Sequence, residues 1–140
     1  MAVHEVRFEE VFAAPREKVF EFFAEHSNMR KVWGGRWERI QEGTDEPNGL
    51  NSVRLVRAGG ATFEETIVSF QRPSLIEYTV TKGGMMKSHL SRMEFSDDAG
   101  GTRLVYTIRF EPKVMLAGRL LTGVFKARWN RGVGNVRPNL

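Results

Sequence analysis

Six segments in the middle of the chain alternate polar and apolar residues with a period of two, and only short turn signals separate them. The segments are 36–43, 51–58, 62–70, 74–81, 87–96 and 102–111, and all are rich in Val, Ile, Phe, Tyr or Thr. Stretches such as "AGGA", "QRPS" and "DDAGG" join them, and such stretches are typical of tight turns. Connections this short favour antiparallel pairing of consecutive strands. The sequence therefore predicts an antiparallel meander.

Helical periodicity is found towards the two ends of the chain. A first strand ending near Phe12 is followed by an expected helix over 13–26 and a short second helix over 27–35. A long helix is expected over 113–131, with Gly132 and Gly134 ending it. An antiparallel sheet needs one face covered, and only these helices can cover it, so the fold class is α+β.

The long helix is predicted to present one stripe of residues to the sheet. The stripe consists of Ala117, Leu120, Leu121, Val124 and Arg128.

Length and composition narrow the class of protein. A chain of 140 residues is expected to form a single domain, residues 1–140. There is no cysteine, and the three histidines are scattered, so we expect neither a metal site nor a cofactor. The sequence lacks the apolar run of a signal peptide or a membrane span. We therefore expect a cytoplasmic protein without integral membrane contact.

The net charge of +4 is concentrated at the C-terminal end. The chain from Lys113 onward carries six basic residues and no acidic one. A solvated helix face and a contact with an anionic partner both explain this pattern. Nucleic acid is not expected, because the helical spacing of Phe125 and Trp129 favours packing on the helix itself. A homodimer is left open.

Symmetric pairing around the tight turns predicts the register of the sheet. Arg54 is placed opposite Glu65, Tyr78 opposite Ser91, and Ser69 opposite Ile76 in separate strand pairs. The same counting gives one shared inner face, which comprises Ser52, Arg54, Val56, Phe63, Glu65, Ile67, Ser69, Ile76, Tyr78, Val80, His89, Ser91, Met93, Tyr106, Ile108 and Phe110.

Glu65 is the unexpected member of that inner face. A carboxylate facing an apolar interior is costly unless it is paired or hydrated, and the predicted register supplies Arg54 as its partner. Two interpretations remain open. The pair either ties the sheet together or forms a polar patch that orients a ligand in an apolar pocket.

His89, Tyr78 and Tyr106 are further polar candidates on the same face. His89 is a weak candidate for a general acid or base, although a lone histidine is more often a structural group. Glu65 is the other weak catalytic candidate, and Arg54 would lower its pKa and oppose that role. The two tyrosine hydroxyls either meet a ligand oxygen, or each tyrosine is a core aromatic residue whose hydroxyl finds a hydrogen-bond partner.

Two pairs of residues are candidates for the entrance of a pocket. Trp33 and Trp37 flank the point where the second helix meets the sheet. There they either form the mouth of the pocket or pack the helix onto the sheet. Met85 and Met86 lie in a Gly-flanked turn and suggest an adaptable entrance or a contact surface.

The order of these motifs resembles the START-like (SRPBCC) superfamily, in its polyketide cyclase/dehydrase and lipid-transport branch. The resemblance rests on "APREKVFEFFAEHSNMRKVW", "GLNSVR", "FEETIVSFQRPSLIEYTV", "GGTRLVYTIRFEP" and the C-terminal amphipathic helix. It implies a helix-grip fold, in which a curved seven-stranded antiparallel sheet wraps the long helix around a hydrophobic cavity. Members bind lipids, sterols, polyketides or other apolar molecules, and some catalyse cyclisation or dehydration. The family has no universal catalytic residue.

Three functions follow from these observations. The leading hypothesis is binding of a small hydrophobic or aromatic, lipid- or polyketide-like ligand in the internal cavity. The alternatives are a cyclase or dehydratase acting in the same cavity, and an interaction module that uses the basic C-terminal helix. The residues expected to contact a ligand are Trp33, Arg54, Glu65, Ile67, Tyr78, His89, Ser91, Tyr106, Ile108 and Leu121.

Overall fold

The computed structural model describes residues 2–140, and the order of its elements is the predicted one. The elements are β1 (His4–Phe12), α1 (Arg16–Ala24), the 3-10 turn η1 (His26–Asn28), α2 (Met29–Trp33), β2 (Arg36–Gln41), β3 (Val53–Ala58), β4 (Ala61–Gln71), β5 (Leu75–Gly83), β6 (Met86–Asp98), β7 (Gly101–Pro112), α3 (Ala117–Val136) and η2 (Arg137–Asn139). The α+β class is thereby confirmed.

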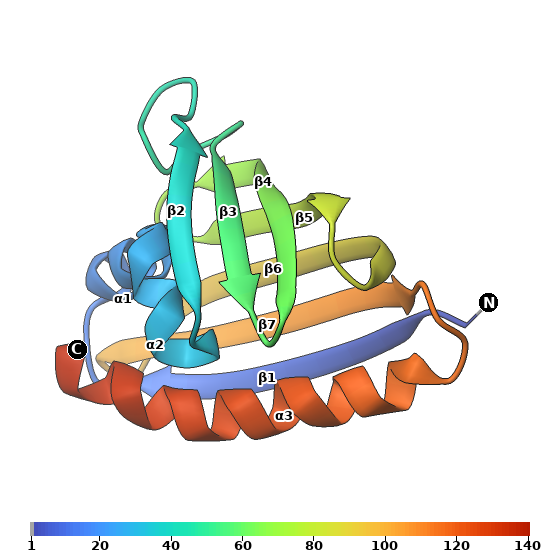
Figure 1. Ribbon diagram of the computed structural model, residues 1–140. Helices are drawn as coiled ribbons and strands as arrows, with labels where there is room; N and C mark the ends of the chain where they lie inside the picture. Colours follow the sequence, from blue (N-terminus) through green and yellow to red (C-terminus); the bar gives the residue numbers. More distant parts are fainter. Residues whose placement is uncertain (1) are drawn as a thin grey trace.

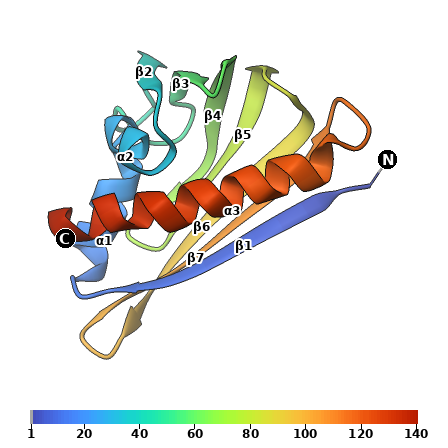
Figure 2. The same cartoon turned by 60° about the horizontal axis from the view of Figure 1, so that its bottom comes forward.

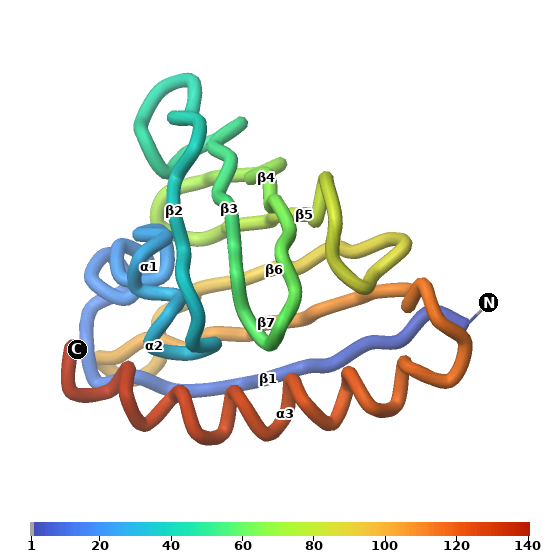
Figure 3. Tube along the Cα trace, viewed as in Figure 1, coloured from blue at the N-terminus to red at the C-terminus, as the bar shows by residue number. Residues whose placement is uncertain are grey.

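Within this described range, the strands form one seven-stranded antiparallel sheet in the order β1-β7-β6-β5-β4-β3-β2. The meander from β2 to β7 is as predicted, and β1 pairs with β7 to place the N-terminal strand at one edge. The sheet curves around α3, and α1 and α2 lie together at one end (Figures 1 and 2). This is the helix-grip arrangement. The two chain ends lie at opposite ends of α3 (Figure 3).

The predicted register is confirmed for most strand pairs. Arg54 pairs with Glu65 and Tyr78 with Ser91. Both pairs are predictable from sequence because tight turns fix the pairing of the strands they join.

The predicted register is wrong at Ser69. A β-bulge between Ile67 and Ser69 shifts the pairing, so that Phe70 rather than Ser69 lies opposite Ile76. The bulge turns Phe70 inward, where its ring packs edge-on against that of Phe20 at 5.2 Å. Burying a phenyl ring instead of a hydroxyl is the physical reason for the shift.

The C-terminal helix does not end where its glycines predicted. It continues through Gly132 and Gly134 to Val136. Gly132 is buried because α2 crosses α3 at this point: a Cβ on Gly132 would lie 2.4 Å from the carbonyl oxygen of Val32. Gly132 is therefore a site of close helix packing and not a stop signal.

The predicted stripe of this helix is also wrong in phase. Leu120 is 68% exposed and Val124 is 44% exposed. Of the predicted set, Leu121 packs against the core, together with Phe125 and the fully buried Trp129. The inward face is thus rotated from the expected one, which changes which α3 side chains reach the interior.

Candidate functional site

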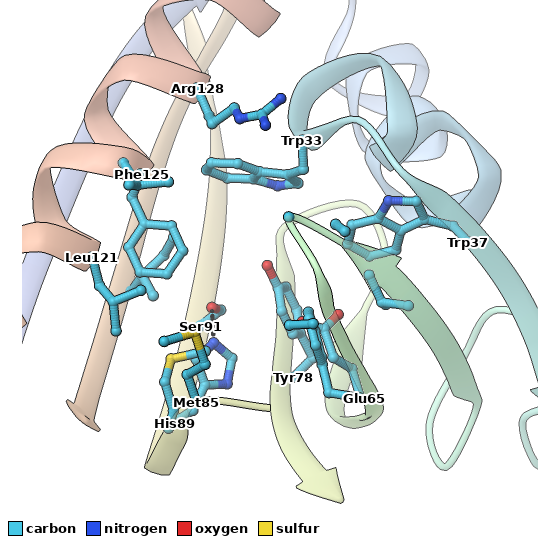
Figure 4. Close-up of a pocket in the computed structure, with 18 of the residues that line it drawn as sticks. Trp33, Trp37, Glu65, Tyr78, Met85, His89, Ser91, Leu121, Phe125 and Arg128 are labelled. Carbon is cyan, nitrogen blue, oxygen red and sulfur yellow. Dashed lines mark hydrogen bonds between the residues drawn. The ribbon is translucent and has the colours of Figure 1, made fainter. Parts of the chain in front are cut away.

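A cavity of about 180 Å³ lies between α3 and the concave face of the sheet. Figure 4 shows side chains from α3 on one side of it and side chains from the sheet on the other. Its opening is bordered by lining residues that are themselves exposed: Gly59, Met85, Val124 and Arg128. The full lining comprises Trp33, Trp37, Val56, Ala58, Gly59, Ala61, Phe63, Glu65, Tyr78, Met85, Met86, His89, Ser91, Tyr106, Ile108, Leu121, Val124, Phe125 and Arg128.

The wall on the helix side is apolar and aromatic. The Trp33 ring, from the end of α2, packs edge-on against Phe125 and Tyr106 at centroid distances of 6.0 and 6.1 Å. Trp129 lies behind Trp33 at 6.1 Å and is buried. Leu121 completes this side of the cavity one helical turn before Phe125. Such a wall suits an apolar ligand surface.

The sheet side carries polar groups, which we call the polar cluster: Arg54, Glu65, Tyr78, His89, Ser91 and Tyr106.

Arg54 and Glu65 form a buried ion pair within this cluster. Arg54 Nε donates to Glu65 Oε1 at 2.8 Å, and both side chains are about 95% buried. The guanidinium also stacks over the Tyr78 ring at 4.4 Å. Burial raises the pKa of Glu65 above its ordinary value, and the charge and hydrogen bond of Arg54 oppose that rise.

The ion pair is not bidentate. Among the described residues, Arg54 Nη2 has no hydrogen-bond partner although it is buried. A pair held by one hydrogen bond recovers less of its desolvation cost than a fork-to-fork pair does. The cluster therefore keeps unused hydrogen-bonding capacity next to the cavity.

Both ring nitrogens of His89 are hydrogen-bonded. The backbone N–H of Val80 donates to Nδ1 at 3.1 Å, which places the proton of the neutral ring on Nε2. Nε2 lies 2.8 Å from the Ser91 hydroxyl and donates to it. Burial, with a smaller contribution from the Arg54 charge, lowers the pKa of His89 to about 4. The ring is therefore neutral at neutral pH, and the lone pair on Nδ1 already accepts a hydrogen bond.

The two tyrosines of the cluster share a hydrogen bond. The hydroxyls of Tyr78, from β5, and Tyr106, from β7, contact each other across the sheet and are fully buried. Burial raises the pKa of Tyr78 to about 12 and that of Tyr106 well above its usual value. Both remain protonated, so one hydroxyl hydrogen stays available for an acceptor that enters the cavity.

The structure brings together most of the residues predicted to contact a ligand. Those that line the cavity are Trp33, Glu65, Tyr78, His89, Ser91, Tyr106, Ile108 and Leu121. Arg54 and Ile67 lie behind this lining, Arg54 between the Trp37 and Tyr78 rings and Ile67 in the core. Trp37, Met85 and Met86 also line it, at or near the places considered for an entrance.

Sequence reasoning missed the α3 contribution of Val124, Phe125 and Arg128. None of the three is among the residues expected to contact a ligand, and all three line the cavity. The signal that could have found them is the position of Trp129, since the largest apolar residue of an amphipathic helix is expected to face inward.

Comparison with known proteins agrees with this architecture. The model of the family described as polyketide cyclase / dehydrase and lipid transport matches residues 3–138. No curated protein matches the sequence significantly.

Solved structures share the fold at low sequence identity. A START superfamily protein from Mycobacterium smegmatis has a TM-score of 0.79 at 12% identity, covering 96% of this chain and 95% of its own. A protein from Thermus thermophilus has a TM-score of 0.76 at 16% identity, covering 97% and 96%. The major latex-like protein 151 of Panax ginseng has a TM-score of 0.71 at 13% identity, covering 96% and 97%. At such identities the likeness concerns the fold alone.

Proposed function

Because the chain belongs to the polyketide cyclase / dehydrase and lipid transport family, we propose that it binds a small hydrophobic or aromatic molecule between the sheet and α3. The observation that carries this proposal is the cavity, whose walls are aromatic on the helix side and hydrogen-bonding on the sheet side. Ligand sites in proteins combine these two features: apolar walls supply affinity and a few polar groups fix orientation.

The volume of the cavity supports a small ligand. An apolar cavity of about 150 Å³ accepts benzene, so the 180 Å³ here suits roughly one aromatic ring. A larger ligand would extend past the exposed lining residues, among them Met85 and Val124. Mono- and bicyclic aromatic molecules are therefore better candidates than sterols.

The polar cluster supports a ligand with a neutral polar group. The charge of Arg54 is already paired with Glu65, and a second anion beside that carboxylate would be repelled. The Tyr78 and Tyr106 hydroxyls donate and accept hydrogen bonds without charge. A ligand carbonyl or hydroxyl fits this arrangement, whereas the carboxylate of a fatty acid does not.

A cyclase or dehydratase working in the same cavity is the second candidate, and Glu65 is the observation that favours it. Its raised pKa brings a cavity-lining carboxyl closer to the range in which it exchanges a proton at neutral pH. His89 is a poorer candidate for that role because both of its ring nitrogens are hydrogen-bonded.

The test is a titration of the purified protein with a panel of small phenols, naphthols, flavonoids, fatty acids and sterols. Calorimetry measures affinity, and mass spectrometry of the recovered ligand measures its conversion. We expect saturable binding of the small neutral aromatics. A binder returns the ligand with its mass and chromatographic retention unchanged, a dehydratase reduces the mass by one water, and a cyclisation without loss of water changes the retention alone.

Neighbouring residues of α3 supply a matched pair of variants. Leu121→Trp fills the cavity and should weaken binding by roughly tenfold or more. Leu120→Trp, on the exposed side of the same helix turn, should leave affinity unchanged. Equal affinities of the two variants would place the ligand outside the cavity, and a panel without any saturable binder would contradict the proposal.

A further inference from the structure

Exposed apolar side chains gather at the start of α3, beside the opening of the cavity. We call them the apolar rim, and within the described residues they are Met85, Val114, Met115, Leu116, Leu120 and Val124. Leu116 is 90% exposed, Met115 72% and Leu120 68%. Isolated apolar residues on a surface are ordinary, whereas a contiguous group marks an interaction site.

The residues of the rim come from segments that are joined in the structure, and two of them line the cavity. The Lys113 backbone N–H donates to the Met85 carbonyl oxygen at 2.9 Å, which joins the segment before α3 to the β5–β6 turn. Leu120 and Val124 lie four residues apart on α3 and so are neighbours on its surface, and Leu116 immediately precedes the helix. Met85 and Val124 also line the cavity. Figure 2 shows the start of α3 at the end of the molecule away from α1 and α2.

Leu116, the most exposed residue of the rim, has an unusual backbone conformation. Leu116 has a φ of 74°, in the left-handed region that favours glycine and asparagine over leucine. A large apolar residue at such a position has a local conformational cost, and burial in the protein does not compensate for it because Leu116 is almost fully exposed. A partner outside the protein would provide that burial.

The charges around the rim indicate what the partner is. Lys113 and Arg119 are exposed beside Leu116 and Leu120, and Arg128 borders the opening next to Val124. From Lys113 to the C-terminus the sequence contains no acidic residue. A second copy of the chain docked rim to rim would bring these cations against their own counterparts. An anionic surface, in contrast, would meet them favourably.

We propose that the apolar rim docks the protein on an anionic lipid bilayer, with the opening of the cavity facing the lipid. Peripheral binding of this kind combines apolar side chains inserted at the interface with basic side chains on the anionic headgroups. It involves no spanning segment, and no helix among residues 2–140 is long and apolar enough to cross a bilayer. An apolar ligand would then pass between bilayer and cavity without crossing water, a consequence that rests on the proposed function.

The test is flotation of the purified protein with two kinds of vesicle, one of phosphatidylcholine and one of equal parts phosphatidylcholine and phosphatidylglycerol. We expect binding to the anionic vesicles and release by salt. The variant Leu116→Asn with Leu120→Gln should reduce the partition coefficient about tenfold or more, because two apolar side chains are lost from the interface. Asparagine tolerates the left-handed conformation, so the fold is retained.

A control variant separates this surface from general surface apolarity. Ile40→Gln with Val68→Gln removes two side chains that are 48% and 45% exposed in β2 and β4, and it should bind like the wild type. Absence of wild-type binding to anionic vesicles, equal binding to neutral ones, or binding unaffected by the rim substitutions would each overturn the proposal. Self-association abolished by the same substitutions would assign the rim to a second copy instead. Ligand affinity measured without vesicles is independent of all these outcomes.

Discussion

The neutral, buried state of His89 predicts a specific loss of stability in mild acid. The folded-state pKa is about 4, against 6.5 for an unperturbed histidine. The unfolded chain therefore takes up the proton at higher pH than the folded protein does. Stability associated with His89 is fully present above about pH 6.5 and is lost as the pH falls towards 4.

The size of this effect follows from the two pKa values. At about 1.4 kcal/mol for each pH unit between them, the full difference amounts to about 3 kcal/mol. Roughly 2 kcal/mol of it should be lost between neutral pH and about pH 5. Glu65 acts with the opposite sign, since its raised pKa makes the folded protein take up a proton first, so wild-type stability alone would mix the two effects.

The variant His89→Gln isolates the histidine. Urea unfolding followed by tryptophan fluorescence gives the free energy of unfolding of wild type and variant at a series of pH values. Glu65 and the surface carboxylates are common to both proteins and cancel in the difference, which should fall by about 2 kcal/mol from neutral pH to about pH 5. A difference that stays constant would refute the reasoning, because it would mean that His89 titrates normally in a water-filled cavity.

Two further predictions concern packing and charge. Arg54→Met leaves the Glu65 carboxyl buried without its cation and should lower the free energy of unfolding, measured with urea, by about 3–5 kcal/mol. Adding Glu65→Leu should restore most of that loss. A double variant no more stable than the single one would show that the ion pair is not the source of the cost. Gly132→Ala should destabilise the protein by about 1–3 kcal/mol because its Cβ would meet the Val32 carbonyl, whereas Gly134→Ala, with open space around it, should stabilise α3 by about 0.5–1 kcal/mol. Equal thermal stabilities for these two glycine variants would contradict the close approach of α2 and α3.

Two pairs of the polar cluster could be predicted from sequence because each joins strands that a tight turn connects. The pairing of Arg54 with Glu65 follows from counting outward from "AGGA", and that of Tyr78 with Ser91 from counting outward from "KGGMM". Such counting fails where a residue is inserted, and it misplaces Ser69 because the gain from burying Phe70 is a tertiary effect.

The helical wall of the cavity could not be predicted in the same way. The rotation of α3 depends on its contact with α2 at Gly132, a contact between segments about 100 residues apart. A glycine in sequence predicts a helix end as readily as a close crossing. The apolar rim escapes prediction for the same reason, because the expected stripe places Leu120 towards the sheet, whereas Leu120 is exposed.

The position of β1 at the edge of the sheet has a consequence for folding during synthesis. Its partner strand is β7, so that His4 pairs with Phe110. The strand that is synthesised first therefore pairs with the strand that is synthesised last. Ribosomes add about 5–20 residues per second, which leaves β1 without its partner for about 5–20 seconds. Contacts this distant in sequence form slowly, whereas the local hairpins from β2 to β7 need no such delay. The meander can therefore assemble first, and the N-terminal strand completes the sheet only when almost the whole chain has emerged.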